Sequence, residues 1–218
     1  MAGQAVFEPL SREERKLIIE TGSIVEYEKG ETIAKQGALS SHINFIGNGI
    51  CKMYLEGPYA RKLIISLINT KTFVGLSKLY DNDRNIFSVA ALEDCMVMEV
   101  HKSALQTLIG SNPEFAKRMI SEISRESNDF LAKLYSQNCK QLHGRLSGAL
   151  IYMSKEIAQS NFIDLPVSRR DLADMAGIAT ESAIRMLSEL NHDGIIALEG
   201  KAIRILKEDL LNKLYEIG

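Results

Sequence analysis

The chain is poor in the residues that mark specialised classes of protein. Its 218 residues include no tryptophan, four prolines, three cysteines and four histidines. Proline is too rare for a collagen-like chain, and cysteine is too rare for a small scaffold held together by disulfides. Lys and Arg number 26 against 28 Asp and Glu, so no overall field would attract the chain to polyanions. Any nucleic-acid-binding face must therefore be local.

Long hydrophobic runs are missing as well. The longest apolar stretches, such as residues 63–68, are much shorter than a membrane span, and the start MAGQAVFEPL has neither the basic nor the apolar region of a signal peptide. We therefore expect a cytoplasmic protein with no membrane partner. The three cysteines, Cys51, Cys95 and Cys139, lie far apart, which favours buried free thiols over disulfides or metal ligands.

The sequence also lacks the motifs of several enzyme classes. It contains no GxSxG, no GxxxxGK followed by Ser or Thr, and no HExxH. A cupin-like β-roll enzyme would hold a metal between clustered His and Glu residues, but no two of the four histidines lie close in sequence. We keep that enzyme as an alternative function and expect no catalytic residues and no metal site.

The first half of the chain has the pattern of an all-β domain. Ser11 and Glu14 have the spacing of a capping box, which predicts the start of a short helix. Beyond it, brief apolar or alternating runs are separated by glycines, a pattern that favours a sandwich, jelly roll or barrel. The expected strands are 24–27, 32–35, 42–46, 50–55, 62–67, 87–92 and 96–100.

From Pro113 onward the apolar residues have the spacing of a long helix. They recur alternately three and four residues apart, as along the seam of a coiled coil. The same spacing fits an amphipathic helix that lies on its own sheet, so periodicity alone leaves both alternatives open. As a two-chain interface, the stripe would consist of Ile120, Ile123, Ser127, Phe130 and Leu134.

The last third predicts a helix-turn-helix followed by a two-stranded wing. Ser168 and Asp171 cap the first helix, Gly177 ends it, and a second helix begins near Thr180. Ala173, four residues before that glycine, is small enough to let the second helix pack closely. Residues 139–218 contain 10 Lys and Arg against 11 Asp and Glu, a net charge of −1, so generic nucleic-acid binding is not supported.

Over nearly its whole length, the chain resembles the cyclic-AMP receptor protein and fumarate-nitrate regulator (CRP/FNR) family of bacterial transcription factors. The resemblance rests on GRLSGALIYMS, LPVSRRDLADMAGIATESAIRMLSELNHDGII and GKAIRIL, and before them on YEKGETIAKQG, Gly49, FVG at 73–75 and ALEDCMVMEV. It implies an α+β fold in three parts. These are a double-stranded β-helix (jelly-roll or β-roll) sensor over 1–112, a dimerisation helix over 113–138, and a winged helix-turn-helix DNA-binding domain over 139–218.

The resemblance implies a homodimeric, sequence-specific regulator that binds an inverted repeat in double-stranded DNA, with RNA polymerase as a further partner. In the major groove, Arg185 can donate two hydrogen bonds to a guanine and Glu181 can accept one from a cytosine amino group. The full set of expected DNA-binding residues adds the second-helix residues Thr180 and Ser182 and the phosphate contacts Ser168, Arg169, Arg170 and Lys201.

The residues that hold cyclic AMP in the family are not matched here. Leu76 and Ser77 follow Gly75 where the family has Glu. The family's Arg-Ser pair reads Asn85-Ile86 or, with a one-residue slip, Arg84-Asn85. The apolar side chains at the base-contacting places of the long helix cannot satisfy the hydrogen-bonding edge of a purine, so we expect an effector other than cyclic AMP. The expected effector pocket comprises Gly75, Leu76, Ser77, Arg84 and Asn85, with Phe130 and Leu131 at the base-contacting places of the long helix.

The sequence also bears on the other effectors of the family. The iron–sulfur branch needs several cysteines near the N-terminus, and none precedes Cys51. Heme stays open, because His42, His101, His143 and eight methionines offer axial ligands. Another small molecule, or no ligand at all in a ligand-independent regulator, completes the alternatives.

Overall fold

The computed structural model describes residues 6–81 and 83–218. Residues 1–5, which belong to the start for which no signal peptide is expected, and Asn82 lie outside the described residues. The chain divides into two compact units. Unit 1 comprises residues 1–56 and 67–129, and unit 2 comprises residues 57–66 and 130–218.

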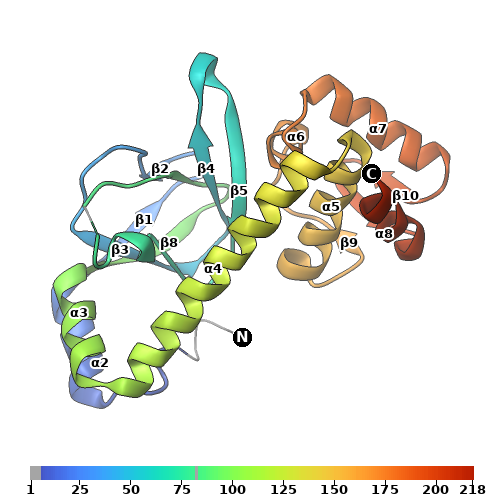
Figure 1. The fold of residues 1–218 in the computed structure, drawn as a ribbon. Helices are drawn as coiled ribbons and strands as arrows, with labels where there is room; N and C mark the ends of the chain where they lie inside the picture. Colours follow the sequence, from blue (N-terminus) through green and yellow to red (C-terminus); the bar gives the residue numbers. More distant parts are fainter. Residues whose placement is uncertain (1–5, 82) are drawn as a thin grey trace. The chain divides into compact units, whose positions relative to one another are not determined.

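Eight antiparallel strands build the β-roll predicted for the first half (Figure 1). One sheet has the order β1-β8-β3-β6 and the other β2-β7-β4-β5. The seven expected strands are confirmed within a residue or two, whereas β6 was missed because three residues are too few to show alternation. The strands are β1 (Gly22–Tyr27), β2 (Thr32–Ala34), β3 (His42–Asn48), β4 (Cys51–Glu56), β5 (Lys62–Ile68), β6 (Thr72–Val74), β7 (Ser88–Ala91) and β8 (Cys95–His101).

Helices cover one face of the first sheet. The predicted capping box starts α2 (Arg12–Thr21), where the backbone N–H of Glu14 donates to Ser11 Oγ and that of Ser11 donates to Glu14 Oε2. Helix α2 packs beside α3 (Lys102–Ser111), which the sequence analysis did not predict (Figure 1). The core between helices and sheet includes Ile43, Val100, Leu105, Leu108 and Phe115, all at most 1% exposed.

The long helix α4 (Pro113–Cys139) carries two different faces. Phe115 and Met119 point into the core of unit 1 and are at most 1% exposed. Ile120 and Ile123, on the predicted stripe, are 64% and 37% exposed. The residues that pack on the chain's own sheet are therefore not the residues of the stripe, which removes the alternative of a single amphipathic face.

Unit 2 contains the predicted helix-turn-helix. Helix α6 (Arg169–Ala176) ends at Gly177, whose φ of 64° suits glycine, and α7 (Thr180–His192) follows. The wing strands β10 (Ile196–Glu199) and β11 (Ala202–Ile205) are joined by β9 (Phe162–Ile163) in the order β10-β11-β9, so the wing sheet has one strand more than expected.

Besides the short η1 (Pro58–Ala60), unit 2 has further helical segments. They are α5 (Leu142–Tyr152), the π-helical segment η3 (Met153–Ala158) and α8 (Glu208–Ile217), of which α8 was not predicted. The glycines of the GRLSGAL segment have a packing reason. A Cβ at Gly148 would lie 2.8 Å from the Tyr215 ring, so only glycine lets α5 and α8 approach this closely.

Candidate nucleic-acid interface and sensor pocket

Helix α7 separates an apolar inner face from a polar outer face. Ala183, Met186 and Leu187 point into unit 2 and are at most 1% exposed. Glu181 and Arg185 are both exposed and lie four residues apart, so they share one side of the helix. Thr180 and Ser182 complete the first turn and are half-buried. The base-reading residues expected from the sequence thus lie at the N-terminal end of an accessible helix face.

Arg185 is held only weakly in the free protein. Its Nε lies 3.7 Å from Glu189 Oε1, and the Arg185 side chain is 70% exposed. Glu189 is shared, because its other oxygen lies 3.2 Å from His143 Nε2. Exposed ion pairs of this kind contribute about 0–1 kcal/mol, so Arg185 can exchange Glu189 for a base at little cost.

The residues expected to contact phosphate differ in the hydrogen bonds that they already make within the chain. Ser168 Oγ accepts from the Asp171 N–H at 3.1 Å and donates to Asp171 Oδ2 at 2.5 Å, so this hydroxyl serves the capping box of α6. Arg169 is half-buried and donates to Gly200 O at 3.4 Å. Burial lowers the pKa of Arg169. Arg170 and Lys201 are exposed.

Three of these residues gather at one place. Ser168, Arg169 and Lys201 line a small hollow between the start of α6 and the wing, together with Leu172 and Ile203. The contact of Arg169 with Gly200 O ties the first helix to the turn of the wing. The structure therefore brings together residues 32 to 33 positions apart in the sequence that are expected to contact the same phosphate backbone.

Sequence reasoning missed a set of polar contacts at the C-terminal end of α6. Lys133 Nζ donates to Met175 O, Gln137 Nε2 donates to Ala176 O at 3.2 Å, and Arg145 Nη1 donates to Gly177 O at 3.4 Å. We call Lys133, Gln137 and Arg145 the α6 clamp. They satisfy three consecutive carbonyls where the helix dipole favours positive charge.

The α6 clamp leaves little space at its centre. A Cβ at Gly177 would collide with the Gln137 side chain, so the clamp and the glycine turn depend on each other. Burial lowers the pKa of Lys133 to about 8. The spacing of Lys133 and Gln137 by four residues, which places both on one side of a helix, was the available signal in the sequence.

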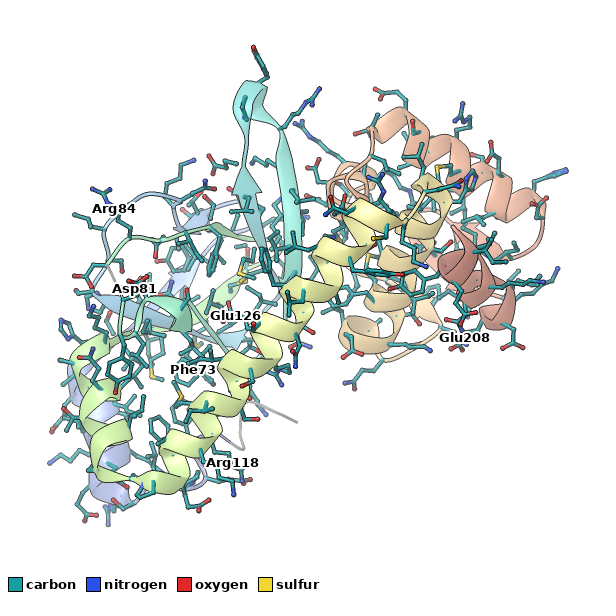
Figure 2. The ribbon with its side chains drawn as sticks, in the orientation of Figure 1. Phe73, Asp81, Arg84, Arg118, Glu126 and Glu208 are labelled. Carbon is teal, nitrogen blue, oxygen red and sulfur yellow. The ribbon has the colours of Figure 1, made fainter. Side chains whose placement is uncertain are left out.

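In the roll, Asn85 rather than Arg84 points inward. Asn85 is 8% exposed, and its Oδ1 accepts from Lys78 Nζ at 2.8 Å. Its backbone oxygen accepts from the Gly37 N–H at 2.7 Å. Arg84 is exposed and donates to Gly37 O at 2.9 Å, and Figure 2 shows it on the outer loop of the roll. Of the two registers left open by the sequence, the structure therefore places Asn85 at the inward position.

The sequence analysis did not single out Lys78, which is buried in the same region. It is 5% exposed, and burial lowers its pKa. Its aliphatic chain passes 3.4 Å from the position of a Cβ on Gly75, whose φ of 86° suits glycine. The Lys78 amine thus lies within the predicted effector pocket and donates to its inward amide.

The pocket residues do not fit a cyclic nucleotide. Leu76 occupies the place of the family's Glu and is 2% exposed, so it offers no acceptor for a ribose hydroxyl. Arg84, the one guanidinium of the expected pocket, lies on the outer loop. Ser77 is exposed. Phe130 and Leu131 belong to unit 2 and are 40% and 59% exposed.

The histidines and cysteines were the candidates for heme and iron–sulfur groups. The rings of His42 and His101 touch edge to face with centroids 5.3 Å apart, which leaves no room for a porphyrin between them. Cys51 and Cys95 are buried, as expected, with Sγ atoms 3.5 Å apart. The expectation of a buried thiol is wrong for Cys139, which is exposed because it ends α4.

Across residues 6–81 and 83–218, no group of three or more His, Cys, Asp or Glu side chains is arranged to hold a metal ion. Over the same residues, no helix is both long and apolar enough to cross a membrane.

Both halves of the chain match known protein families. A model of the Crp-like helix-turn-helix domain matches residues 144–214, and a model of the cyclic nucleotide-binding domain matches residues 24–112. The chain is 26% identical over 182 residues to transcriptional activator protein FnrA of Stutzerimonas stutzeri, covering 82% of this chain and 74% of the relative. It is 27% identical over 194 residues to the fumarate nitrate reduction regulatory protein of Klebsiella oxytoca, covering 86% and 76%.

Solved structures show the same fold. FixK2 from Bradyrhizobium japonicum superposes with a TM-score of 0.81 at 22% identity, covering 88% of this chain and 96% of that protein. The c-di-GMP responsive global regulator CLP of Xanthomonas campestris superposes with a TM-score of 0.77 at 20% identity, covering 89% and 99%. At these identities the likeness shows the fold alone.

Proposed function

Because the chain belongs to the CRP/FNR family of transcription regulators, we propose that it binds an inverted repeat in duplex DNA as a homodimer. Regulators of this family bind DNA, act as dimers and are not enzymes, so the cupin-like alternative falls away. In the proposed complex, one α7 enters the major groove at each half-site. The two half-sites lie one helical turn apart, about 34 Å.

The observation that carries the proposal is the accessible position of Arg185. It lies one turn into α7, on the face that also carries Glu181, and it pairs with the exposed carboxylate of Glu189, which contributes little. Arg170 and Lys201 are exposed in α6 and the wing and supply phosphate contacts. Ser168 caps α6, and Arg169 links α6 to the turn of the wing. In the proposed complex both residues also lie near the DNA backbone.

The stripe of α4 is the proposed dimer interface. Ile120, Ile123, Phe130 and Leu134 are 37% to 64% exposed in the single chain, and Ser127 is exposed between them. Apolar side chains at coiled-coil spacing bury their surface against a second copy of the same helix. This supports a division into a sensor (1–112), a dimerisation helix (113–138) and a DNA-binding domain (139–218).

The buried Lys78 favours a second candidate, a regulator that needs no ligand. The Lys78 amine donates to Asn85 at the inward position of the pocket, so that polar group is satisfied by the chain itself. RNA polymerase remains a proposed partner, and duplex DNA as the target implies a cytoplasmic location.

Selection of random duplex DNA by the purified full-length protein, with no ligand added, tests the proposal. We expect enrichment of an inverted repeat with half-sites about one helical turn apart. The matched control is the same selection with Arg185→Ala, which should lose its preference at one position of each half-site. Enrichment of direct repeats or of single sites would contradict the proposal. A folded dimer that enriches no sequence, whether or not cell extract is added, would contradict it as well.

A further inference from the structure

Two histidines face each other across neighbouring strands of the roll. His42 begins β3 and His101 ends β8, and the two are direct partners in the antiparallel register. The next pair outward, Ser41 and Lys102, is joined by a hydrogen bond from Lys102 N to Ser41 O of 2.9 Å. Since hydrogen-bonded and non-hydrogen-bonded pairs alternate, His42 and His101 form a non-hydrogen-bonded pair, in which side chains approach most closely.

The two rings lie close to each other. The ring centroids of His42 and His101 are 5.3 Å apart, and the planes are inclined by 88°. Each ring contacts a serine through Nδ1. His101 Nδ1 lies 2.7 Å from Ser103 Oγ, and His42 Nδ1 lies 3.5 Å from Ser41 Oγ. Among the described residues, neither Nε2 atom has a hydrogen-bond partner, so both are available to a ligand.

The surroundings are open and carry a carboxylate. His42 lines a surface hollow with Ser41 and Asp83, and both histidines are half-buried rather than enclosed. Asp83 Oδ1 forms an ion pair with Nζ of Lys102, the residue next to His101. An ion can therefore enter from solvent, and the charge of Lys102 beside it is already compensated.

We propose that His42 and His101 form a two-histidine site for a first-row transition-metal dication of the Zn²⁺ or Cu²⁺ type, with water completing the coordination. Imidazole nitrogen suits these ions, whereas Mg²⁺ and Ca²⁺ prefer oxygen ligands. Two protein ligands make a weaker site than the three or four of structural zinc sites, so the ion exchanges with solvent. The bound ion bridges β3 and β8.

Binding requires the right tautomer of His101. This residue is also the N-cap of α3, where its Nδ1 accepts from the Ser103 N–H at 3.3 Å. When Nε2 binds the ion, the ring proton lies on Nδ1 and is donated to Ser103 Oγ instead. The hydroxyl then orients the ring as a second-layer partner, and no net proton is lost from the neutral imidazole.

Calorimetric titration of the tag-free, full-length protein with zinc chloride and with copper sulfate tests the site. We expect one ion per chain. His42→Gln and His101→Asn should each weaken binding at least tenfold, and asparagine is chosen at 101 because it keeps the N-cap. His143→Gln, whose ring pairs with Glu189 in unit 2, is the matched control and should bind as the parent does.

A spectroscopic signature separates ligation from a structural effect. The electron paramagnetic resonance spectrum of the Cu²⁺-loaded parent should show nitrogen hyperfine coupling from two imidazoles. In each variant the coupling should be reduced to that of one imidazole, while the circular dichroism spectra match the parent. No binding by the parent, or unchanged affinity in both variants, would overturn the proposal. No DNA is present in these measurements, so their outcome is independent of the proposed function.

Discussion

At the scale of single residues, the side chains that would meet DNA differ in how free they are. Arg185 is tied only by a solvent-exposed ion pair, and Arg170 projects from the first turn of α6. Ser168 is instead engaged by Asp171 in a capping box. A residue type that suits phosphate binding can therefore serve first to begin a helix, and the sequence pattern alone does not separate the two roles.

We predict that Arg185→Ala weakens binding to the selected site by roughly 1–3 kcal/mol and relaxes the preference at one base pair. The lost interaction is a bidentate contact to a base edge, which only one of the four bases satisfies well. The measurement is a binding titration against the selected duplex and its single-base variants.

Arg170→Ala is the control for this prediction. It removes an expected phosphate contact, so affinity should fall equally for all duplexes, and the salt dependence of binding should become shallower by about one ion. If Arg185→Ala also weakened all duplexes equally, Arg185 would be a phosphate contact and the proposed docking of α7 would be wrong.

At the scale of elements, the α6 clamp links the end of the long helix to the turn of the helix-turn-helix. Lys133, Gln137 and Arg145 bind carbonyls of three successive residues that end α6. The turn held there precedes α7 directly, so the clamp sets where the recognition helix begins. Within unit 2, the position of α7 therefore depends on side chains outside the proposed base-reading face.

Lys133 gives unit 2 a specific pH dependence. Burial lowers its pKa from 10.5 to about 8, so between these values the unfolded chain holds a proton that the folded chain has released. The free energy of unfolding contributed by this group therefore rises as the pH increases from about 8 to about 10.5. Because Lys133 is only half-buried, we expect an increment of about 1–2 kcal/mol.

Urea denaturation of the parent and of Lys133→Met at pH 7 and pH 10 measures this effect. The stability of the parent relative to the variant should be greater at pH 10, since the variant lacks the titrating amine. A relative stability that stays constant, or that falls with rising pH, would show that the Lys133 amine is not desolvated in the folded protein.

At the scale of the whole molecule, the exposed stripe of α4 is the proposed interface between two chains. Phe115 and Met119 are buried within unit 1, whereas Ile120, Ile123, Phe130 and Leu134 of the stripe are 37% to 64% exposed in the single chain. Burial of such side chains is worth about 25 cal/mol per Å² of apolar surface, which favours association with a second copy.

We predict that Ile123→Glu weakens the dimer by at least tenfold, because it places two like charges across the seam. Sedimentation equilibrium checks the result. Ser121→Glu is the control, since Ser121 is exposed on the same helix but lies outside the stripe, and it should leave the dimer unchanged. A dimer that survives Ile123→Glu would mean that the chains associate through another surface.

The sequence by itself determined the elements whose signals are local. Alternation predicted seven strands of the roll, capping boxes placed the starts of α2 and α6, and Gly177 marked the turn before α7. Elements with short or weak signals were not predicted. The three residues of β6 show no alternation, and α3 and α8 lack a distinctive start. The proposed DNA-reading face rests on helix periodicity, which fixes which residues share a side.

Only the tertiary structure decided which polar groups meet. The inward position of Asn85 and its bond to the buried Lys78, the α6 clamp, and the pairing of His42 with His101 each join residues from different elements. Such contacts depend on strand register and helix packing, which arise from the whole core rather than from neighbouring residues. The location of the helix-turn-helix could therefore be predicted from the sequence. The polar contacts inside the β-roll could be identified only in the folded chain.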